Sequence, residues 1–324
     1  MRSHPVDPQR ILRSLLTERW QSRTTVVLVS LAAAILGLIA PYSQKQFVDL
    51  LTRGHPSLHW IWIAFGSALG YQCLNQLALW LSSRESVYSQ KALGEALFSR
   101  MLAVRGGLIG HRPAGEAVSL FAVDVPGAAG ILDQCLSTGA SLFFPILLAP
   151  LALRHFFGIP LGASLGAITA IGGVNVVLAL RQSRFFYRFK QLAAERTGLV
   201  AEWVGNIRTL RILGWTESVE QRIFAVRQRE TRNRIAMVTN GQLMNSIAGS
   251  ATYVVNVLAV AALVRLRGTG VTPGELLALL WILGVFLARP LRQFPWFFVI
   301  GLDAISSIRR LQAALAVESP SPRI

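Results

Sequence analysis

Few residues in this chain are arranged in a way that could carry out chemistry. Residues 162–166 (GASLG) fit the GxSxG pattern of a hydrolase nucleophile elbow. That pattern needs a turn between a strand and a helix, whereas here it lies inside an apolar stretch with no histidine or carboxylate near it. His55 and His59 have the i, i+4 spacing of a metal pair, but Pro56 interrupts a helix between them. The sequence therefore predicts neither a catalytic nucleophile nor a metal site.

The residues of a nucleotide site are missing as well. A P-loop has the pattern GxxxxGK[ST], in which backbone amides, the lysine and the hydroxyl group together hold phosphate and magnesium. The three lysines of the chain, Lys45, Lys91 and Lys190, are each followed by Gln or Ala. We therefore expect no catalytic residues and no cofactor in this chain.

Charged residues inside apolar segments are the remaining binding candidates. Arg289 and Arg292 lie in the inner half of one apolar segment, near Trp296. A charge costs about 2.5–3.5 kcal/mol at the centre of an inserted helix, so such residues usually face a cavity or a partner. With Asn175, which can also hydrogen-bond to a neighbouring helix, they are candidates for lining a cavity that favours an amphipathic anion. In the alternative interpretation, both arginines lie at the cytoplasmic interface and extend to lipid headgroups.

Composition indicates that these residues are positioned by membrane helices. The chain has 324 residues, of which 52% are hydrophobic and 15% charged, with a mean hydropathy of +0.47. Soluble domains carry about 25% charged residues, and a helix needs about 20 apolar residues to cross a bilayer. Six segments qualify and predict an all-α fold of six transmembrane helices: roughly 24–50, 58–82, 131–153, 158–180, 241–264 and 274–300.

The distribution of basic residues predicts the orientation. A net charge of +16 would suit a nucleic-acid binder only if the basic residues clustered on a water-soluble surface. Instead, the N-terminal segment and the connections 83–130 and 181–240 hold twenty-two Lys and Arg, against four in the three short loops on the other side. By the positive-inside rule, both termini and both long connections are expected in the cytoplasm of a multi-pass protein, in the cell or inner membrane.

Three parts of the chain are expected. Residues 1–23 are expected to form a cytoplasmic segment. Within it, a helix over residues 8–20 would have an apolar face and a charged face, as in an amphipathic elbow helix that lies in the membrane interface. Residues 24–315 form the six-helix domain, and residues 316–324 are expected to be a linker.

The long connections are expected to continue the helices into the cytoplasm. The connection 181–240 contains no proline, and a helix from residue 58 to about 105 would span about 70 Å. The bilayer core accounts for less than half of that length. A channel has no evident need for such extensions, whereas a protein coupled to a cytoplasmic motor does.

Charged residues lie where each long connection must turn. The first contains RPAGE at 112–116, followed by Asp124. The second reads EWVGNIRTLRILGWTE at 202–217. The last apolar segment runs from Arg-Pro-Leu at 289–291 to ISSIRRL at 305–311.

These three stretches resemble the intracellular loops and the sixth helix of exporter-type ABC transporters, and Trp215 with Arg-Pro-Leu favours the multidrug-resistance-protein (C) branch. The resemblance extends from the elbow helix to about residue 315. It implies two loops that transmit movements of an ATPase to the membrane helices. The residues that it places in these loops are Arg112, Gly115, Glu116, Asp124, Ile207, Arg208, Arg211, Trp215 and Glu217.

The resemblance also implies partners. ATP and Mg²⁺ would bind a nucleotide-binding domain, either beyond residue 324 or on a separate subunit, and the complete transporter would be an ATP-hydrolysing translocase. A second six-helix unit, identical or different, would complete an alternating-access pore for a small molecule or peptide. The alternative function is an ATP-independent channel or secondary carrier. Carriers often show matching broken helices in two halves, which this sequence lacks, and a P-loop downstream of residue 324 or in a neighbouring reading frame would discriminate the two.

Overall fold

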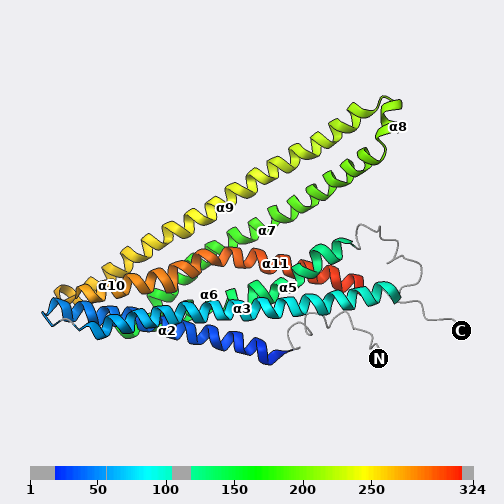
Figure 1. The fold of residues 1–324 in the computed structure, drawn as a ribbon. Coiled ribbons are helices and arrows are strands. Elements are labelled where there is room, and N and C mark those ends of the chain that lie inside the picture. The colour runs from blue at the N-terminus through cyan, green and yellow to red at the C-terminus, as the bar shows by residue number, and fades with distance from the viewer. Residues whose placement is uncertain (1–18, 56, 104–117, 316–324) are drawn as a thin grey trace.

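The computed structural model describes residues 19–55, 57–103 and 118–315, and every regular element in these ranges is a helix. The all-helical fold class predicted from the sequence is confirmed for this part of the chain. Figure 1 shows an elongated molecule in which long helices run back and forth along one axis. The continuous helices are α2 (Trp20–Thr52), α3 (Leu58–Ala103), α7 (Leu161–Gly205) and α9 (Thr216–Arg267).

Two further long segments are composite helices with π-helical turns. The first consists of η2 (Leu120–Asp124), α5 (Val125–Gly130), η3 (Ile131–Leu136) and α6 (Ser137–Phe157). The second consists of α10 (Pro273–Ile282), η5 (Leu283–Ala288) and α11 (Arg289–Leu315). π-Turns insert a residue into the helical ladder and often mark functional positions. The sequence analysis did not predict them.

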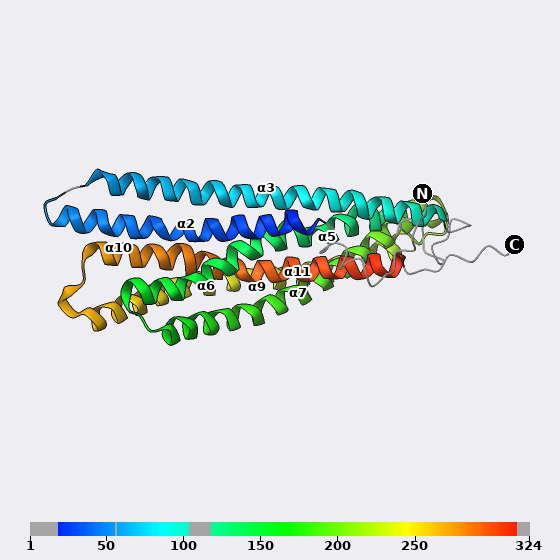
Figure 2. The same ribbon diagram turned by 90° about the horizontal axis from the view of Figure 1, so that it is seen from below.

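The helices separate into a bundle and an arm. α2 and α3 lie side by side along their length (Figure 2), α10 packs against α2, and α11 packs against α5, α6 and α7. α7 and α9 diverge together from the bundle and are joined at their far end by the short helix α8 (Ile207–Ile212) (Figure 1). The expected helical extensions are therefore present: α9 alone has 52 residues, or about 78 Å at 1.5 Å per residue.

Five of the long helical segments are long and apolar enough to cross a bilayer. They are Trp20–Thr52, Leu120–Phe157, Leu161–Gly205, Thr216–Arg267 and Pro273–Leu315. α3 is not among them, because Gln72, Asn75 and Gln76 lower the hydropathy of its apolar half. The structure thus confirms several membrane-capable helices but not the predicted number of six.

Small residues let the bundle helices approach closely. A Cβ atom added at Gly70 of α3 would lie 2.6 Å from Cδ2 of Leu36 in α2. At Gly37 of α2 it would lie 2.9 Å from Cζ of Phe286 in η5. A larger residue at either position would therefore force the side chain of Leu36 or Phe286 to move.

Buried apolar side chains form two cores, one at each end of the bundle. The first, around Phe157, Leu279 and Phe286, joins α6, α9 and α10 near the short connections. The second, around Leu97, Leu132 and Leu311, joins α3, η3 and α11 near the long ones. Several predictions lie outside the described residues: the elbow helix at 8–20, the linker at 316–324, and the turn residues Arg112, Gly115 and Glu116.

Candidate functional site

The tip of the arm is a compact turn built around α8. α7 ends at Gly205, and Asn206 follows with its side-chain amide donating to the carbonyl of Glu202 over 3.1 Å. α8 ends before Gly214, which has the left-handed φ of 68° that favours glycine. The N–H of Trp215 then donates to the carbonyl of Leu210 over 2.9 Å. The short helix is thereby fixed between the ends of two long ones.

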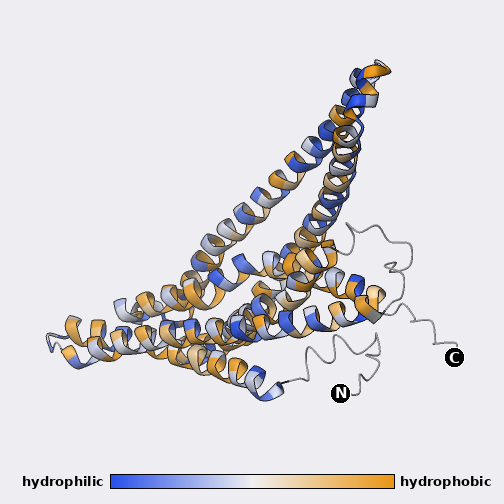
Figure 3. Ribbon diagram, turned by 45° about the vertical axis from the view of Figure 1, so that its right-hand side comes forward, coloured by the Kyte–Doolittle hydropathy of each residue, from blue (hydrophilic) through white to orange (hydrophobic). Residues whose placement is uncertain are grey.

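The tip presents apolar and charged side chains to solvent. Ile212 is 84% exposed and Trp215 is 60% exposed. The charged residues predicted for this loop, Arg208, Arg211 and Glu217, are also exposed. Glu217 lies in the first turn of α9, where a negative charge interacts favourably with the helix dipole. Figure 3 shows hydrophobic residues at the tip and hydrophilic residues along the arm.

The two helices of the arm are joined by polar contacts along their length. Asn240 Nδ2 of α9 donates to Gln182 Oε1 of α7 over 2.8 Å. Further toward the tip, Asn233 Nδ2 donates to the carbonyl of Phe185 over 2.9 Å. Because these contacts tie α7 and α9 together at successive turns, the arm can transmit a force applied at its tip.

Glu230 is the centre of these contacts. Its Oε2 atom accepts from Arg196 Nε of α7 at 2.8 Å and from Arg227 Nη1 of α9 at 2.9 Å. The side chain of Glu230 is only 4% exposed. Burial acts to raise the pKa of this carboxyl, but the hydrogen bonds and charges of Arg227 and Arg196 outweigh it and hold the pKa below its ordinary value. The carboxylate therefore stays ionised and holds the arm together.

Asp124, predicted for the first loop, is buried in the bundle. Its Oδ1 atom forms an ion pair with Arg310 Nη2 of α11 at 2.5 Å, and its side chain is 2% exposed. Burial raises the pKa of the carboxyl above its ordinary value, and the charge of Arg310 opposes the rise. Asp124 thus connects the first loop to the end of the last helix.

Serines of α3 donate hydrogen bonds to α5 and η3 of the first composite helix, which the sequence analysis did not predict. Ser82 Oγ donates to the carbonyl of Leu132, and Ser86 Oγ donates to the carbonyl of Ala129 over 3.2 Å. Ser83 Oγ donates to Asp133 Oδ1 over 2.6 Å. The four-residue spacing of Ser82 and Ser86, which places both on one face of a helix, was the available signal.

Asn175, predicted to line a cavity, lies fully buried between α7 and α11. Its side-chain amide donates to the carbonyl of Leu291 over 3.1 Å. The reason is Pro295, which has no N–H to donate to the carbonyl of Leu291 four residues earlier. Asn175 supplies the missing donor.

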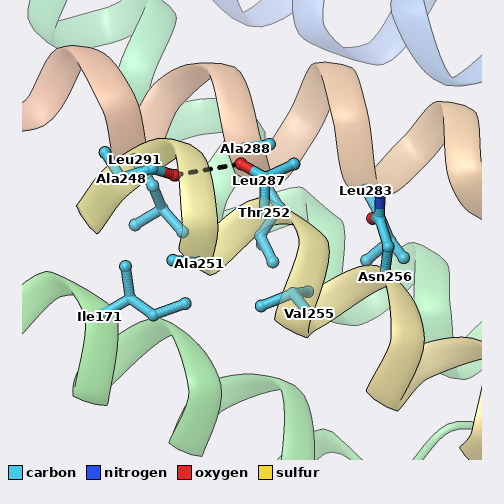
Figure 4. A pocket seen from close by; sticks show the side chains of 10 residues that line it. All are labelled: Ile171, Ala248, Ala251, Thr252, Val255, Asn256, Leu283, Leu287, Ala288 and Leu291. Atoms are coloured by element: carbon cyan, nitrogen blue, oxygen red, sulfur yellow. Dashed lines mark hydrogen bonds between the residues drawn. The ribbon is translucent and has the colours of Figure 1, made fainter. Parts of the chain in front are cut away.

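The other three candidate cavity residues are exposed. Arg289 and Arg292 begin α11 directly after the π-turn, and Trp296 is 41% exposed. A nearby cavity between α7, α9 and η5 has a volume of only about 10 Å³, enough for about one water molecule (Figure 4). It is lined by small and aliphatic side chains such as Ala251 and Leu287. This cavity is too small to hold a substrate.

The structure therefore brings the predicted residues together in three separate places. Those of the second loop gather at α8, Asp124 lies against α11, and the two arginines lie at the start of α11.

Comparison with known proteins gives two matches. A family model described as ABC transporter transmembrane region matches residues 24–289. The chain is also 23% identical over 329 residues to a human protein described as ATP-binding cassette sub-family C member 10. That alignment covers 99% of this chain but 21% of the relative. The chain thus spans about a fifth of the length of this relative, whose sub-family agrees with the branch predicted from the sequence.

Proposed function

Because this chain belongs to the family of ABC transporter transmembrane regions, we propose that it is the substrate-translocating domain of an ATP-driven exporter. The observation that carries the proposal is the arm formed by α7, α8 and α9. It is internally bonded along its length and ends in a small, exposed and partly apolar tip. Such a tip suits docking onto a moving partner, and the bonded arm suits transmission of that movement to the membrane helices.

The partner at the tip is a nucleotide-binding domain. We assign ATP and Mg²⁺ to that domain, because none of the three lysines of this chain lies in a P-loop sequence. Exposed Ile212 and Trp215 would supply apolar contacts to it, and Arg208, Arg211 and Glu217 charged ones. Arg112, Gly115 and Glu116 would form the second contact, with Asp124 passing movement from there to α11 through Arg310.

α3 completes a set of six membrane helices in this proposal. It lies along α2, and its own surface includes exposed Trp62, Phe65 and Leu69, which suit contact with lipid. The beginning of α2, the end of α11 and the tip of the arm lie toward the same end of the molecule (Figure 1). The positive-inside rule places that end in the cytoplasm.

Transport requires a second six-helix unit. The arm leaves the bundle and exposes the apolar face of α9 around Tyr253 and Val257, which are 75% and 67% exposed. A second unit or lipid would cover this face. The two units would enclose an alternating-access pore, with Arg289, Arg292 and Trp296 facing an amphipathic anion.

The test uses the complete transporter in proteoliposomes. Ile212→Asp at the arm tip is expected to lower transport per ATP hydrolysed, because a loss of about 1.4 kcal/mol in docking lowers the docking equilibrium constant about tenfold. Ile235→Asp, at a residue of α9 that is 61% exposed on the shaft of the arm, is the matched control. Equal coupling ratios in the wild type and Ile212→Asp would refute the docking role.

A further inference from the structure

A second site with binding chemistry lies between the cytoplasmic parts of α7 and α11. The two helices enclose a cleft of about 640 Å³, far larger than the cavity at the π-turn. Its walls include Phe186 and Lys190 of α7, and Leu302 and Arg309 of α11. Arg289 and Arg292 do not line it.

The lining of the cleft carries excess positive charge. Lys190, Arg309 and Arg310 contribute three positive charges, and Asp303 contributes one negative charge. Lys190 pairs with Asp303, and Arg310 pairs with Asp124. Arg309 is exposed and has no ion-pair partner among the residues that the structure describes. The cleft is therefore suited to an anion, which could pair with Arg309.

Arg309 and the apolar side chains lie toward opposite ends of the cleft. The Lys190–Asp303 pair lies nearer the apolar end, with the Lys190 ammonium 5.0 Å from the centre of the Phe186 ring. Val299 and Phe186 line it at one end, and Arg309 and Arg310 line it farther along α11. Val299 and Arg310 are about 16 Å apart along the helix axis at 1.5 Å per residue. This length accommodates a charged group together with several methylene groups.

The direction of this polarity matches that of a lipid in the inner leaflet. In the orientation proposed above, the fourth and sixth membrane spans end near residues 180 and 300, so the apolar end of the cleft adjoins the bilayer. The cationic end then lies farther into the cytoplasm. A phospholipid of the inner leaflet has its acyl chains toward the bilayer and its headgroup toward the cytoplasm, as the cleft requires.

We infer that the cleft between α7 and α11 is a binding site for an anionic amphiphile of the inner leaflet, with its acidic group at Arg309 and its acyl chains along Val299, Leu302 and Ile305. The inference rests on the proposed orientation but not on ATP-driven transport. A bound anion would also compete with Asp303 for Lys190. Occupancy would therefore alter the contact that joins α7 to α11.

Native mass spectrometry of the full chain tests the inference. The protein is released from phosphatidylcholine nanodiscs that contain phosphatidylglycerol, and the retained phosphatidylglycerol is counted. Arg309→Glu is expected to weaken retention of phosphatidylglycerol by at least about tenfold. Each basic residue near an anionic group strengthens binding several-fold, and this variant both removes a positive charge and adds a negative one. Arg222→Glu, an exposed arginine of α9 outside the cleft, should leave retention unchanged.

A second variant and two competitors make the test specific. Ile305→Asn, at a residue that is 40% exposed, should weaken retention of phosphatidylglycerol by removing apolar contact while leaving every charge in place. Equal retention by the wild type and Arg309→Glu overturns the inference. Displacement by inorganic phosphate at equal concentration overturns the assignment to an amphiphile. If dihexanoyl phosphatidylglycerol binds from water while the long-chain lipid is not retained, the ligand does not come from the membrane, and that part of the inference is overturned. ATPase coupling enters none of these measurements, so failure here is separable from failure of the transport proposal.

Discussion

The side-chain amide of Asn175 in α7 donates a hydrogen bond to the backbone carbonyl of Leu291 in α11, over 3.1 Å and out of contact with solvent. Pro295 removes the N–H that would otherwise pair with this carbonyl. The bond therefore ties the last helix, one turn before its proline, to a neighbouring helix. It lies just past the π-turn Leu283–Ala288, where the last helix is already irregular.

Loss of this amide should destabilise the protein. Asn175→Ala leaves the carbonyl of Leu291 buried without a donor, which costs about 1–3 kcal/mol. We expect a lower midpoint in thermal unfolding of the purified protein in detergent. Asn75→Ala is the matched control, because the amide of Asn75 forms no hydrogen bond within the described residues. Equal midpoints for the two variants would show that this hydrogen bond does not contribute to the stability of the protein.

Charge reversal at the two loops should uncouple transport. Glu217→Lys places a positive charge at the N-terminus of α9, next to the exposed tip. Combined with Glu116→Lys in the first loop, it is expected to leave ATP hydrolysis in place and reduce transport in reconstituted vesicles of the complete transporter. Glu95→Lys combined with Glu195→Lys, at two exposed carboxylates outside the loops, is a control for the same change in net charge. An unchanged ratio of transport to hydrolysis in the double variant would count against the coupling role of both loops.

Removal of the buried charge in the arm should loosen α7 from α9. Glu230→Gln weakens contacts with two arginines and is expected to cost about 1–2 kcal/mol, since both arginines are partly exposed. Faster hydrogen exchange in residues 190–235 would report the change. Glu195→Gln should have a smaller effect, because its pair with Arg229 is exposed on both sides.

The same carboxylate predicts a pH dependence. The pKa of Glu230 is lower in the folded protein than its ordinary value of 4.5. Its contribution to stability is therefore fully present above about pH 4.5 and is lost as the pH falls through the folded pKa. In the wild type, protection of residues 190–235 from hydrogen exchange should decline as the pH falls through that range. In Glu230→Gln, this pH-dependent decline should be absent. Identical profiles would assign the acid sensitivity to other groups.

Two glycines of α5 should respond differently to the same substitution. A Cβ atom at Gly127 would lie 2.6 Å from Ser307 Oγ and 3.1 Å from Ser307 Cβ, whereas Gly130 has nothing within 4 Å. Gly127→Ala is expected to destabilise the protein by about 1–3 kcal/mol through overpacking. Gly130→Ala should be neutral or stabilising, because alanine favours helix. Equal unfolding midpoints for Gly127→Ala and Gly130→Ala would mean that Ser307 and α11 move to accommodate the added methyl group without loss of stability.

The two candidate arginines of the substrate cavity can be tested by transport. Arg289→Ala with Arg292→Ala should lower transport of an anionic amphipathic substrate more than transport of a neutral one. Arg181→Ala, at an exposed arginine just past the end of the fourth predicted span, is the control. If transport of the anionic and the neutral substrate falls to the same extent, the two arginines have an interfacial role instead.

Local sequence features determined much of the fold. The apolar stretches and the proline-free connection 181–240 predicted long helices that extend past the membrane, and Gly205 and Gly214 lie where the arm turns. These features are visible in the sequence because periodicity, span length and glycine act over a few neighbouring residues. The resemblance in residues 202–217 likewise identified a family that the comparisons confirm.

Only the tertiary structure decided which distant residues meet. Asp124 looks like a solvated loop carboxylate in sequence but pairs with Arg310, and Asn175 binds a backbone carbonyl instead of facing an open cavity. The sequence predicted that Asn175 can hydrogen-bond to a neighbouring helix, and the structure shows such a bond. It did not identify the acceptor or the partner of Asp124, because the need for each arises elsewhere in the chain: at Pro295, which leaves a carbonyl unpaired, and at a helix end that buries an acid. Such pairings depend on how whole helices pack, and no local pattern encodes that packing.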